Sequence, residues 1–278
     1  MKKYGKIVRT AIAYAVLIIL TFLCLFFFYV LIINATRSHA ELQKGFSALP
    51  GTHFLENLKN VANDGSFPMF RGIFNSLLVS TCSAALCTYF SSLTAYGLYA
   101  YQFKARKAAF TFIMAILVMP TQVTAMGFLR LVTKMGLYDT LWPLIIPSIA
   151  SPAVFYFMYS YLQSSLPLSL VEAARIDGSG EFRTFNKIVM PIMKPAFAAM
   201  AILNGMNAWN NYLWPLLVIR SSEKYTLTLG LNTLINPYGD NYSLLVVGSF
   251  FSIIPIFILF VCFQQYFIEG MTAGAVKE

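Results

Sequence analysis

Six long stretches without a charged residue constrain the fold of this chain more than any other feature of its sequence. A helix needs about 20 apolar residues to cross a hydrocarbon core about 30 Å thick. Six windows meet this requirement and contain no Asp, Glu, Lys or Arg: 11–33, 72–101, 108–129, 141–163, 196–219 and 241–268. With 58% hydrophobic and 11% charged residues, the sequence predicts an all-α polytopic membrane protein with six transmembrane helices.

The basic residues predict on which side of the membrane each loop lies. A cationic segment precedes the first window, which is too long for the apolar part of a cleavable signal peptide and is expected to remain as the first span. Short loops rich in Lys and Arg stay in the cytoplasm, so both termini are expected there, and 12 of the 20 basic residues then lie inside. Because these cations flank spans, they do not indicate nucleic-acid binding.

The residues that are missing from the windows exclude several mechanisms. A proton-driven carrier needs ionisable groups near the middle of the membrane, and an intramembrane enzyme needs clusters of Asp, Glu, His or Cys. The two histidines, His39 and His53, lie in the first outer loop, and the four cysteines lie in windows without CxxC spacing, which indicates packing residues. The sequence has no GxxxxGK[ST] phosphate loop. We therefore expect a non-catalytic chain without metal or other cofactor, and any ATP hydrolysis on another chain.

Uncharged polar residues in the fifth window mark a candidate path for a solute. At 100° per residue, Asn204, Asn207, Asn211 and Trp214 share one helical face. Amide groups and aromatic rings suit a neutral polyhydroxyl solute such as a sugar, and with Asn210 these residues are our candidates for the substrate path. Asn side chains also form hydrogen bonds between membrane helices, so packing is the alternative.

Prolines interrupt three of the windows. They are Pro120, Pro143, Pro147, Pro152 and Pro255. Broken helix hydrogen bonds within a membrane are tolerated where protein or a water-filled cavity satisfies the freed carbonyl groups. The prolines are compatible with a transport path and with simple kinks.

The stretch VEAARIDGSGEFRTFNKIVMPIMKP, residues 171–195, has six charged residues between Glu172 and Lys187. Ser169 and Glu172 have the spacing of a capping box, so we expect a short helix to begin with Ser169 as N-cap. The helix should stop at Gly178, which can adopt the left-handed conformation that ends many helices.

A second short helix is expected to begin near Gly180 and to end before Pro191. It would carry an apolar stripe formed by Phe182, Phe185, Ile188 and Val189. An apolar stripe on a charged cytoplasmic hairpin favours docking to a partner protein, although the stripe could also lie on the inner surface of this protein.

The same hairpin resembles the EAA loop of permease subunits of ABC importers, which has the pattern EAA-x3-G-x9-I-x-L-P. The matching residues begin at Glu172, continue with Gly178 and end at Pro191, with Met190 in place of Leu. The resemblance implies that residues 164–195 form a cytoplasmic coupling loop that docks on an ATPase. Its docking residues would be Glu172, Ala173, Ala174, Gly178, Phe182, Phe185, Ile188 and Pro191.

Three further segments narrow the resemblance to carbohydrate importers of the maltose type. WNNYLWPL at 209–216 resembles their WN-x-[FY]-x-x-P segment, and YTLTLGL at 225–231 resembles their TLPxGL segment, with Thr228 in place of Pro. The terminus GMTAGAVKE resembles that of the smaller, six-helix permease of the maltose importer. The resemblance extends over most of the chain from about Arg71 onward.

The resemblance implies the partners of a bacterial plasma-membrane permease: a second homologous permease, a cytoplasmic ATPase dimer and an external sugar-binding protein. Residues 1–278 would form one transmembrane permease domain. The tail 269–278 would contact the ATPase, or would be a frayed end; its contact residues would be Thr272, Ala273, Gly274 and Lys277. The outer loop would face the binding protein through Asn232, Asn236 and Tyr238.

The leading hypothesis from the sequence is a membrane subunit of an ATP-driven importer of di- or oligosaccharides. A facilitator that acts alone on a neutral polar solute is one alternative, and it predicts transport without ATP. A membrane scaffold that recruits a cytoplasmic partner is the other, and it predicts no transport.

Overall fold

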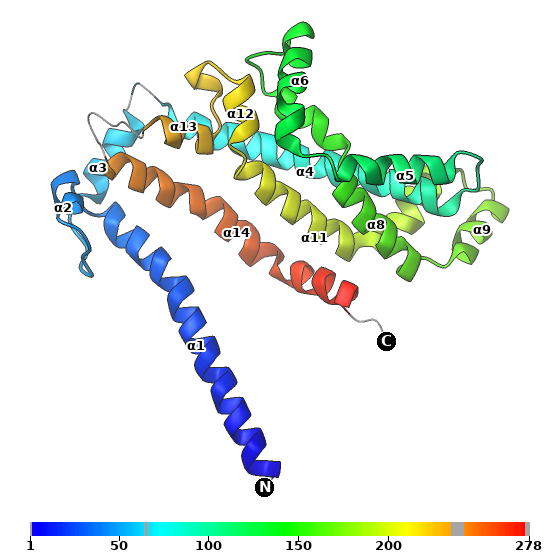
Figure 1. Cartoon of the computed structure of the whole chain (residues 1–278), viewed down its shortest axis with the longest axis horizontal. Coiled ribbons are helices and arrows are strands. Elements are labelled where there is room, and N and C mark those ends of the chain that lie inside the picture. The colour runs from blue at the N-terminus through cyan, green and yellow to red at the C-terminus, as the bar shows by residue number, and fades with distance from the viewer. Residues whose placement is uncertain (1, 64, 66, 235–241, 276–278) are drawn as a thin grey trace. The chain divides into compact units, whose positions relative to one another are not determined.

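The computed structural model describes residues 2–63, 65, 67–234 and 242–275, with side chains described within 6–265. The regular structure in these ranges is helical, and none of the described residues lies in a strand (Figure 1), which confirms the predicted all-α class. Five helices are long and apolar enough to cross a membrane, and a bent pair gives a sixth candidate. The chain divides into two compact units, residues 1–69 with 231–254 and residues 70–230 with 255–278.

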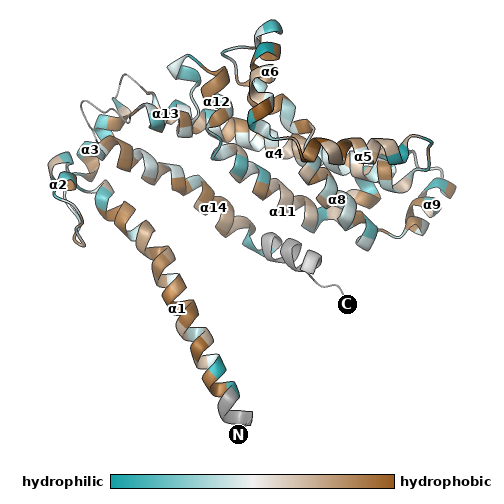
Figure 2. Ribbon diagram, in the orientation of Figure 1, coloured by the Kyte–Doolittle hydropathy of each residue, from teal (hydrophilic) through white to brown (hydrophobic). Residues whose placement is uncertain are grey.

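The first unit contains the first span and the loop that follows it, which the sequence predicts to be an outer loop. Its helices are α1 (Lys2–Ala35), α2 (His39–Gln43), α3 (Phe54–Ala62) and the first part of α14 (Tyr242–Ala275). Figure 2 shows that α1 is hydrophobic over most of its length. Most of its side chains are exposed, as expected of a helix that faces lipid.

Hydrogen bonds around Arg37 order the outer loop of this unit. The buried Arg37 guanidinium donates to Oδ1 of Asn34 at 3.1 Å, to the carbonyl of Gly45 at 2.8 Å and to the carbonyl of Glu41. Asn57 donates to the carbonyl of Arg37 at 2.9 Å. A buried cation with several acceptors can remain charged, so this loop has a defined structure and presents His39 and His53 on it.

Besides α14 from Pro255 onward, the second unit holds the remaining helices, apart from the end of α13 at residues 231–233. They are α4 (Met69–Ala100), α5 (Arg106–Leu117), α6 (Thr121–Lys134), α7 (Trp142–Ile145), the 3-10 turn η1 (Ile146–Ile149), α8 (Pro152–Ser165), α9 (Leu168–Ile176), α10 (Glu181–Thr184), the π-helical turn η2 (Phe185–Val189), α11 (Met190–Trp209), α12 (Leu213–Val218), the 3-10 turn η3 (Ser222–Lys224) and α13 (Leu227–Thr233). Its main hydrophobic core lies where α4, α8 and α11 meet, and Met158, Leu162 and Met193 are fully buried there.

Three of the predicted spans differ from single straight helices, and one of them is the fourth window, which forms α7, η1 and α8. The third window forms α5 and α6, which meet at an angle of 101° across Val118–Pro120. Pro120 has no N–H to continue the helix, and its extended conformation directs the chain into a new axis. In the fifth window α11 ends at Trp209 and α12 begins at Leu213, so the window is also broken.

The last helix is longer than the predicted sixth span. α14 continues to Ala275, so Thr272, Ala273 and Gly274 lie in this helix rather than in a separate tail. Lys277 lies outside the described residues.

Candidate functional site

A cavity of about 610 Å³ lies within the second unit. Its lining comes from α4, α6, the α7 to α8 region and the α11 to α12 region: Val79, Ser83, Cys87, Thr121, Thr124, Phe128, Pro143, Leu144, Pro147, Ser148, Ala150, Ser151, Pro152, Asn204, Asn207, Ala208, Asn211, Trp214 and Pro215. The volume is in the range of sites for small organic molecules. None of these lining residues is Asp, Glu, Lys, Arg or His. Uncharged amides, hydroxyls and apolar rings therefore define its chemistry.

The cavity lies where three membrane segments are broken. Thr121 is the first residue of α6, Ser151 and Pro152 begin α8, and Asn211 lies between α11 and α12. A helix that ends within a membrane leaves backbone groups without helical partners, and a polar cavity can supply those partners. The breaks thus place helix ends and polar side chains around one space.

The asparagines differ in how much hydrogen-bonding capacity they offer to the cavity. Asn204 donates through Nδ2 to the Met200 carbonyl at 3.1 Å, so its Oδ1 is left to accept. Asn211 accepts through Oδ1 from the backbone N–H of Trp214 at 3.2 Å, so its Nδ2 is left to donate. The exposed Asn207 amide makes no hydrogen bond to another described residue. Asn207 thus has both donors and an acceptor for a ligand.

An aromatic pair forms one wall of the cavity. The Trp214 ring packs edge-on against Phe128, with 4.8 Å between centroids and 73° between planes. This contact fixes the indole beside Asn211 and gives the cavity a flat apolar surface. Such a surface complements the C–H faces of a sugar ring, while the amides complement its hydroxyl groups.

The structure corrects part of the predicted path. Asn204, Asn207, Asn211 and Trp214 line one cavity, but the break after Trp209, rather than one continuous helical face, brings the last two to it. Asn210 does not line the cavity, and its Nδ2 donates at 3.0 Å to the Met206 carbonyl.

Sequence reasoning missed the contributions of α4 and α6 to this cavity. Ser83 and Cys87 of α4 and Thr124 of α6 line it, and the Ser83 hydroxyl also donates to the Leu144 carbonyl at 3.2 Å. Small polar residues spaced three or four apart, Ser83 with Cys87 and Thr121 with Thr124, were the available signal, because such pairs lie on one face of a helix.

The predicted start of the hairpin is wrong by two residues. α9 begins at Leu168 with Pro167 as N-cap, and no side chain caps it. Ser169 is therefore the second helical residue and Glu172 lies beyond the first turn, so these two residues form no capping box. The extended conformation of Pro167 and its missing N–H favour a helix that begins immediately after it.

The predicted end of this helix is correct. Gly178 has a φ of 76°. Its N–H bonds to the Arg175 carbonyl at 3.0 Å, and the Ser179 N–H bonds to the Ala174 carbonyl at 2.9 Å. These two bonds form a Schellman motif, in which a left-handed residue closes the helix. A side chain at Gly178 would have space but a strained backbone.

The predicted apolar stripe divides between two environments. Phe182 is 67% exposed, whereas Phe185 and Val189 are fully buried in the core of the second unit. The expectation that Phe185 docks on a partner is wrong for this structure, because its ring packs against Tyr89 and Tyr96 of α4. Exposed docking candidates remain at Glu172, Ala173, Gly178, Phe182 and Pro191, with Ile188 half-buried and Ala174 buried.

The second hairpin helix continues into the fifth span instead of ending before Pro191. A π-helical turn, η2, joins α10 to α11, and the Met190 N–H bonds to the Phe185 carbonyl, five residues earlier. Pro191 then lies in the first turn of α11, directly after η2, and it has no N–H to donate to the preceding turn. The hairpin and the span are therefore continuous.

Asp139 holds the segment at residues 220–224, which follows α12. Its Oδ1 accepts from the backbone N–H of Arg220 and of Ser221, both at 2.9 Å, and its Oδ2 accepts from the Ser221 hydroxyl at 2.6 Å and from Lys224 Nζ at 3.1 Å. Partial burial acts to raise the pKa of Asp139, but these hydrogen bonds outweigh it and hold the pKa well below its usual range. Asn75 fixes the same segment by donating to the carbonyl of Tyr225 at 3.0 Å.

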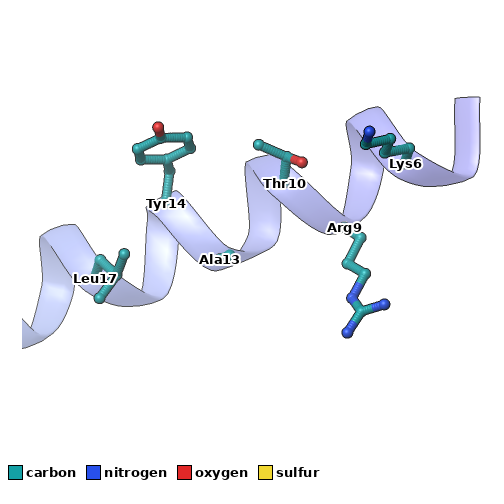
Figure 3. A pocket seen from close by; sticks show the side chains of 6 residues that line it. All are labelled: Lys6, Arg9, Thr10, Ala13, Tyr14 and Leu17. Atoms are coloured by element: carbon teal, nitrogen blue, oxygen red, sulfur yellow. The ribbon is translucent and has the colours of Figure 1, made fainter. Parts of the chain in front are cut away.

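A second hollow runs along the N-terminal part of α1 and is drawn in Figure 3. All six lining residues come from this one helix, and the cations Lys6 and Arg9 lie at its end, followed by Tyr14. A hollow with a single wall cannot enclose a solute, so it is not a second translocation site. Its cations and its tyrosine are typical of a helix end at a lipid headgroup layer.

Several predicted residues lie outside the cavity or outside the described residues. Asn232 is exposed in α13, and Asn236 and Tyr238 lie outside the described part of the chain. The four cysteines are unpaired, and only Cys87 is buried. Among the described residues, no group of three or more His, Cys, Asp or Glu side chains could hold a metal ion.

Comparisons with known proteins agree with this architecture. The family described as "Binding-protein-dependent transport system inner membrane component" matches residues 66–273. The arabinooligosaccharides transport system permease protein AraQ of Bacillus subtilis (strain 168) is 40% identical over 261 residues, which cover 93% of this chain and 92% of that protein. The lactose transport system permease protein LacG of Rhizobium radiobacter is 30% identical, with 96% of each chain covered. A chain of a bacterial ABC transporter involved in the import of the acidic polysaccharide alginate has the same fold, with a TM-score of 0.80 at 22% identity over 92% of this chain and 96% of that one.

Proposed function

The chain belongs to the family of inner membrane components of binding-protein-dependent transport systems, and from this premise we propose that it forms half of the path through which an ATP-driven importer moves neutral di- or oligosaccharides. It is a multi-pass membrane permease subunit, and ATP hydrolysis belongs to a separate partner chain. Both termini then lie in the cytoplasm, as the distribution of basic residues predicts.

The observation that carries this proposal is the chargeless, amide-lined cavity at the three helix breaks. Asn204, Asn207 and Asn211 together offer donors and acceptors, and Trp214 offers a ring face. A neutral polyhydroxyl solute can use all of these groups without a counter-ion. An acidic sugar or a phosphate ester, in contrast, would be desolvated beside this wall without a cation to pair with it.

The similar proteins support the same class of solute. One relative is named for arabinooligosaccharides and another for lactose, and both solutes are neutral. The alginate importer is similar in fold, but its name gives an acidic polysaccharide. We propose that the uncharged lining separates this chain from a path for acidic polymers.

The coupling hairpin is the proposed contact with the ATPase. Glu172 is an exposed carboxylate that forms no hydrogen bond with another described residue, and Phe182 is a largely exposed ring on the next helix. An exposed charged group and an exposed ring on a short helix pair suit a cleft on a partner protein. ATP-driven closure of two ATPase subunits would then move this hairpin and, through η2, the cavity wall on α11.

The remaining proposed partners complete the importer. A second homologous permease would supply the other half of the path, and a sugar-binding protein would deliver the solute to the outer side. We propose that Asn232, Asn236 and Tyr238 face that binding protein. We also propose that the end of α14 and the following residues, including Thr272, Ala273, Gly274 and Lys277, contact the ATPase dimer.

A matched pair of asparagine variants tests the proposed path. Asn207→Leu removes a free amide from the cavity, whereas Asn210→Leu makes the same chemical change three residues later, outside the cavity. Uptake of labelled oligosaccharides is measured in cells that express the complete importer, with and without depletion of ATP. We expect a reduction of about tenfold or more for Asn207→Leu, the effect of leaving one or two polar groups of the solute unpaired, and near-normal uptake for Asn210→Leu.

Two outcomes of this experiment contradict the proposal. Equal uptake by both variants at equal abundance would remove Asn207 from the path. Uptake that continues after ATP depletion would support the facilitator, which needs neither the hairpin nor a partner.

A further inference from the structure

Tyrosines on the inner half of α4 hold the coupling hairpin against the rest of the second unit. The Tyr96 hydroxyl donates to Oε2 of Glu181 at 3.2 Å, at the start of α10. The Tyr99 hydroxyl donates at 2.9 Å to the carbonyl of Leu166, just before α9 begins. One helix therefore contacts both arms of the hairpin.

An ion pair closes the corner between these two arms. Arg175 Nε lies 2.8 Å from Oε1 of Glu181, so the pair spans the turn at Gly178 that separates α9 from α10. The Arg175 guanidinium also lies over the Tyr101 ring, 5.1 Å from its centroid, which ties the corner to the residue that follows α4. Without these contacts the glycine joint would allow the two short helices to rotate relative to one another.

The two faces of α10 and η2 have different neighbours. On one face Phe185 is fully buried, and its ring centroid lies 5.7 Å from that of Tyr89 and 5.6 Å from that of Tyr96. On another face Phe182 is 67% exposed. The surface available to a partner and the surface that binds α4 thus lie on the same rigid turn.

The helix that receives these contacts also forms a wall of the cavity. Ser83 and Cys87 line the cavity, and Tyr96 lies 13 residues after Ser83 on the same helix, a distance of about 20 Å at 1.5 Å per residue. α11 gives a second connection, because it runs without interruption from η2 to Asn204 and Asn207. Movement of the hairpin can reach the cavity through both helices only if the hairpin and α4 move together.

We infer that Arg175, Glu181 and Tyr96, with Tyr101, form a clamp of positioning residues that makes the coupling hairpin move as one body with α4. The inference rests on the proposed function, since it requires an ATPase that moves the hairpin. With the clamp intact, displacement of α9 by the partner displaces α4 and the cavity wall. With the clamp open, α9 turns at Gly178 and the α4 wall of the cavity stays in place, so less solute is transported for each ATP hydrolysed.

The clamp has little effect on stability, which separates its role from simple structural support. Arg175 and Glu181 side chains are 36% and 43% exposed, and exposed ion pairs contribute little to folding. Tyr96→Phe removes one hydroxyl and leaves the ring packing. Variants of these residues should therefore fold, assemble and hydrolyse ATP, with the defect confined to the coupling of hydrolysis to transport.

The test uses the complete importer, purified through this chain and reconstituted in proteoliposomes. Three quantities are measured: the amount of ATPase that co-purifies, the rate of ATP hydrolysis, and oligosaccharide taken up per ATP hydrolysed. The variants are Glu181→Gln and Tyr96→Phe. Matched controls are Glu223→Gln, at the outer end of the unit, and Tyr156→Phe, an exposed tyrosine of α8.

We expect both clamp variants to lower uptake per ATP by about fivefold or more, the lower end of typical coupling between sites, with co-purification and hydrolysis within about twofold of the wild type. The controls should keep the wild-type ratio. Exchange of the charges in the double variant Arg175→Glu with Glu181→Arg should recover part of the ratio that each single change loses, because the ion pair is restored in the opposite sense.

Failure of the clamp and failure of the proposed function give different results. If the wild-type complex hydrolyses ATP but takes up none of the oligosaccharides, the proposed function is wrong. If the wild type transports and Glu181→Gln keeps the same uptake per ATP, the clamp is overturned. Loss of the ATPase from the purified clamp variants also overturns it, because the residues would then serve assembly.

Discussion

Replacement of Asp139 by Ala should loosen the outer segment at residues 220–224 without unfolding the membrane helices. The carboxylate accepts four hydrogen bonds from this segment, two of them from the backbone amides of Arg220 and Ser221. The residue also has a φ of 57°, a conformation that Asp tolerates better than Ala. The substitution thus removes acceptors and adds backbone strain at one position.

The size of the effect follows from these contacts. The Asp139 side chain is 23% exposed and that of Lys224 is 43% exposed, so the ion pair itself counts for little. Loss of the two backbone bonds and the Ser221 bond, with the strain, should lower the local opening free energy by about 2–3 kcal/mol. At 1.36 kcal/mol for each factor of ten, amide exchange at Arg220 and Ser221 should accelerate by about 30- to 150-fold.

Hydrogen–deuterium exchange measured by mass spectrometry on the detergent-solubilised protein checks this value. Asp139→Asn keeps an oxygen that can accept from both amides and tolerates the positive φ, so its exchange should rise only about fivefold. Glu223→Ala is the matched control, because it removes a carboxylate from the same segment that makes no hydrogen bond to another described residue. Exchange at Arg220 and Ser221 that is the same in Asp139→Ala as in Glu223→Ala would refute the reasoning.

The lowered pKa of Asp139 sets the pH dependence of this segment. A carboxyl group whose pKa is lower in the folded state stabilises that state above its unfolded pKa of about 3.9, and the contribution is lost as the pH falls through the lower, folded value. Intrinsic exchange rates change with pH and must be corrected for. After that correction, protection of the two amides should be constant between about pH 5 and 7, and a decline within this range would contradict the assignment.

Three further predictions concern the joint, the docking residue and the outer loop. Gly178→Ala should cost about 1–2 kcal/mol through its positive φ and lower the thermal unfolding temperature in detergent, whereas Gly180→Ala, at a φ of −66°, should have little effect; equal shifts would contradict a left-handed joint. Glu172→Ala should reduce co-purification of the ATPase at unchanged permease abundance, and full co-purification would remove Glu172 from the docking surface. The hydrogen bond from His53 to Glu56 raises the pKa of His53, so NMR titration should find it above about 6.5 and lower in Glu56→Gln; this contribution to stability is present at low pH and lost as the pH rises through the raised value.

Local signals were read correctly from the sequence where the competing interactions were also local. The left-handed joint at Gly178 depends on the residue itself and on two backbone bonds nearby. The cap at Ser169 was wrong because Pro167, two residues earlier, starts the helix first. Pro191 was read as a stop, but the π turn that absorbs its missing N–H is set by tertiary packing of Phe185, which sequence periodicity does not report.

The candidate cavity, too, could be predicted from the sequence only in part. The residue types that line it, Asn and Trp in an apolar window, were evident from the sequence, as were the prolines at the breaks. Their arrangement was not, because the break after Trp209 changes the geometry of the last two residues, and the opposite walls at Ser83 and Thr124 come from segments about 80 to 120 residues away. Contacts such as that of Tyr96 with Glu181, 85 residues apart, depend on helix packing that one sequence does not reveal.

The continuity of η2 with α11 fixes the rotational phase between the hairpin and the cavity. Because helical structure runs without a break from Glu181 to Trp209, with Pro195 inside it, each residue added to or removed from this stretch turns the hairpin by about 100° around the helix axis relative to Asn204 and Asn207. A chimaera that takes its hairpin from a relative must therefore preserve the number of residues between the two, whereas its sequence can vary. The length of this stretch is therefore more constrained than the identity of its residues.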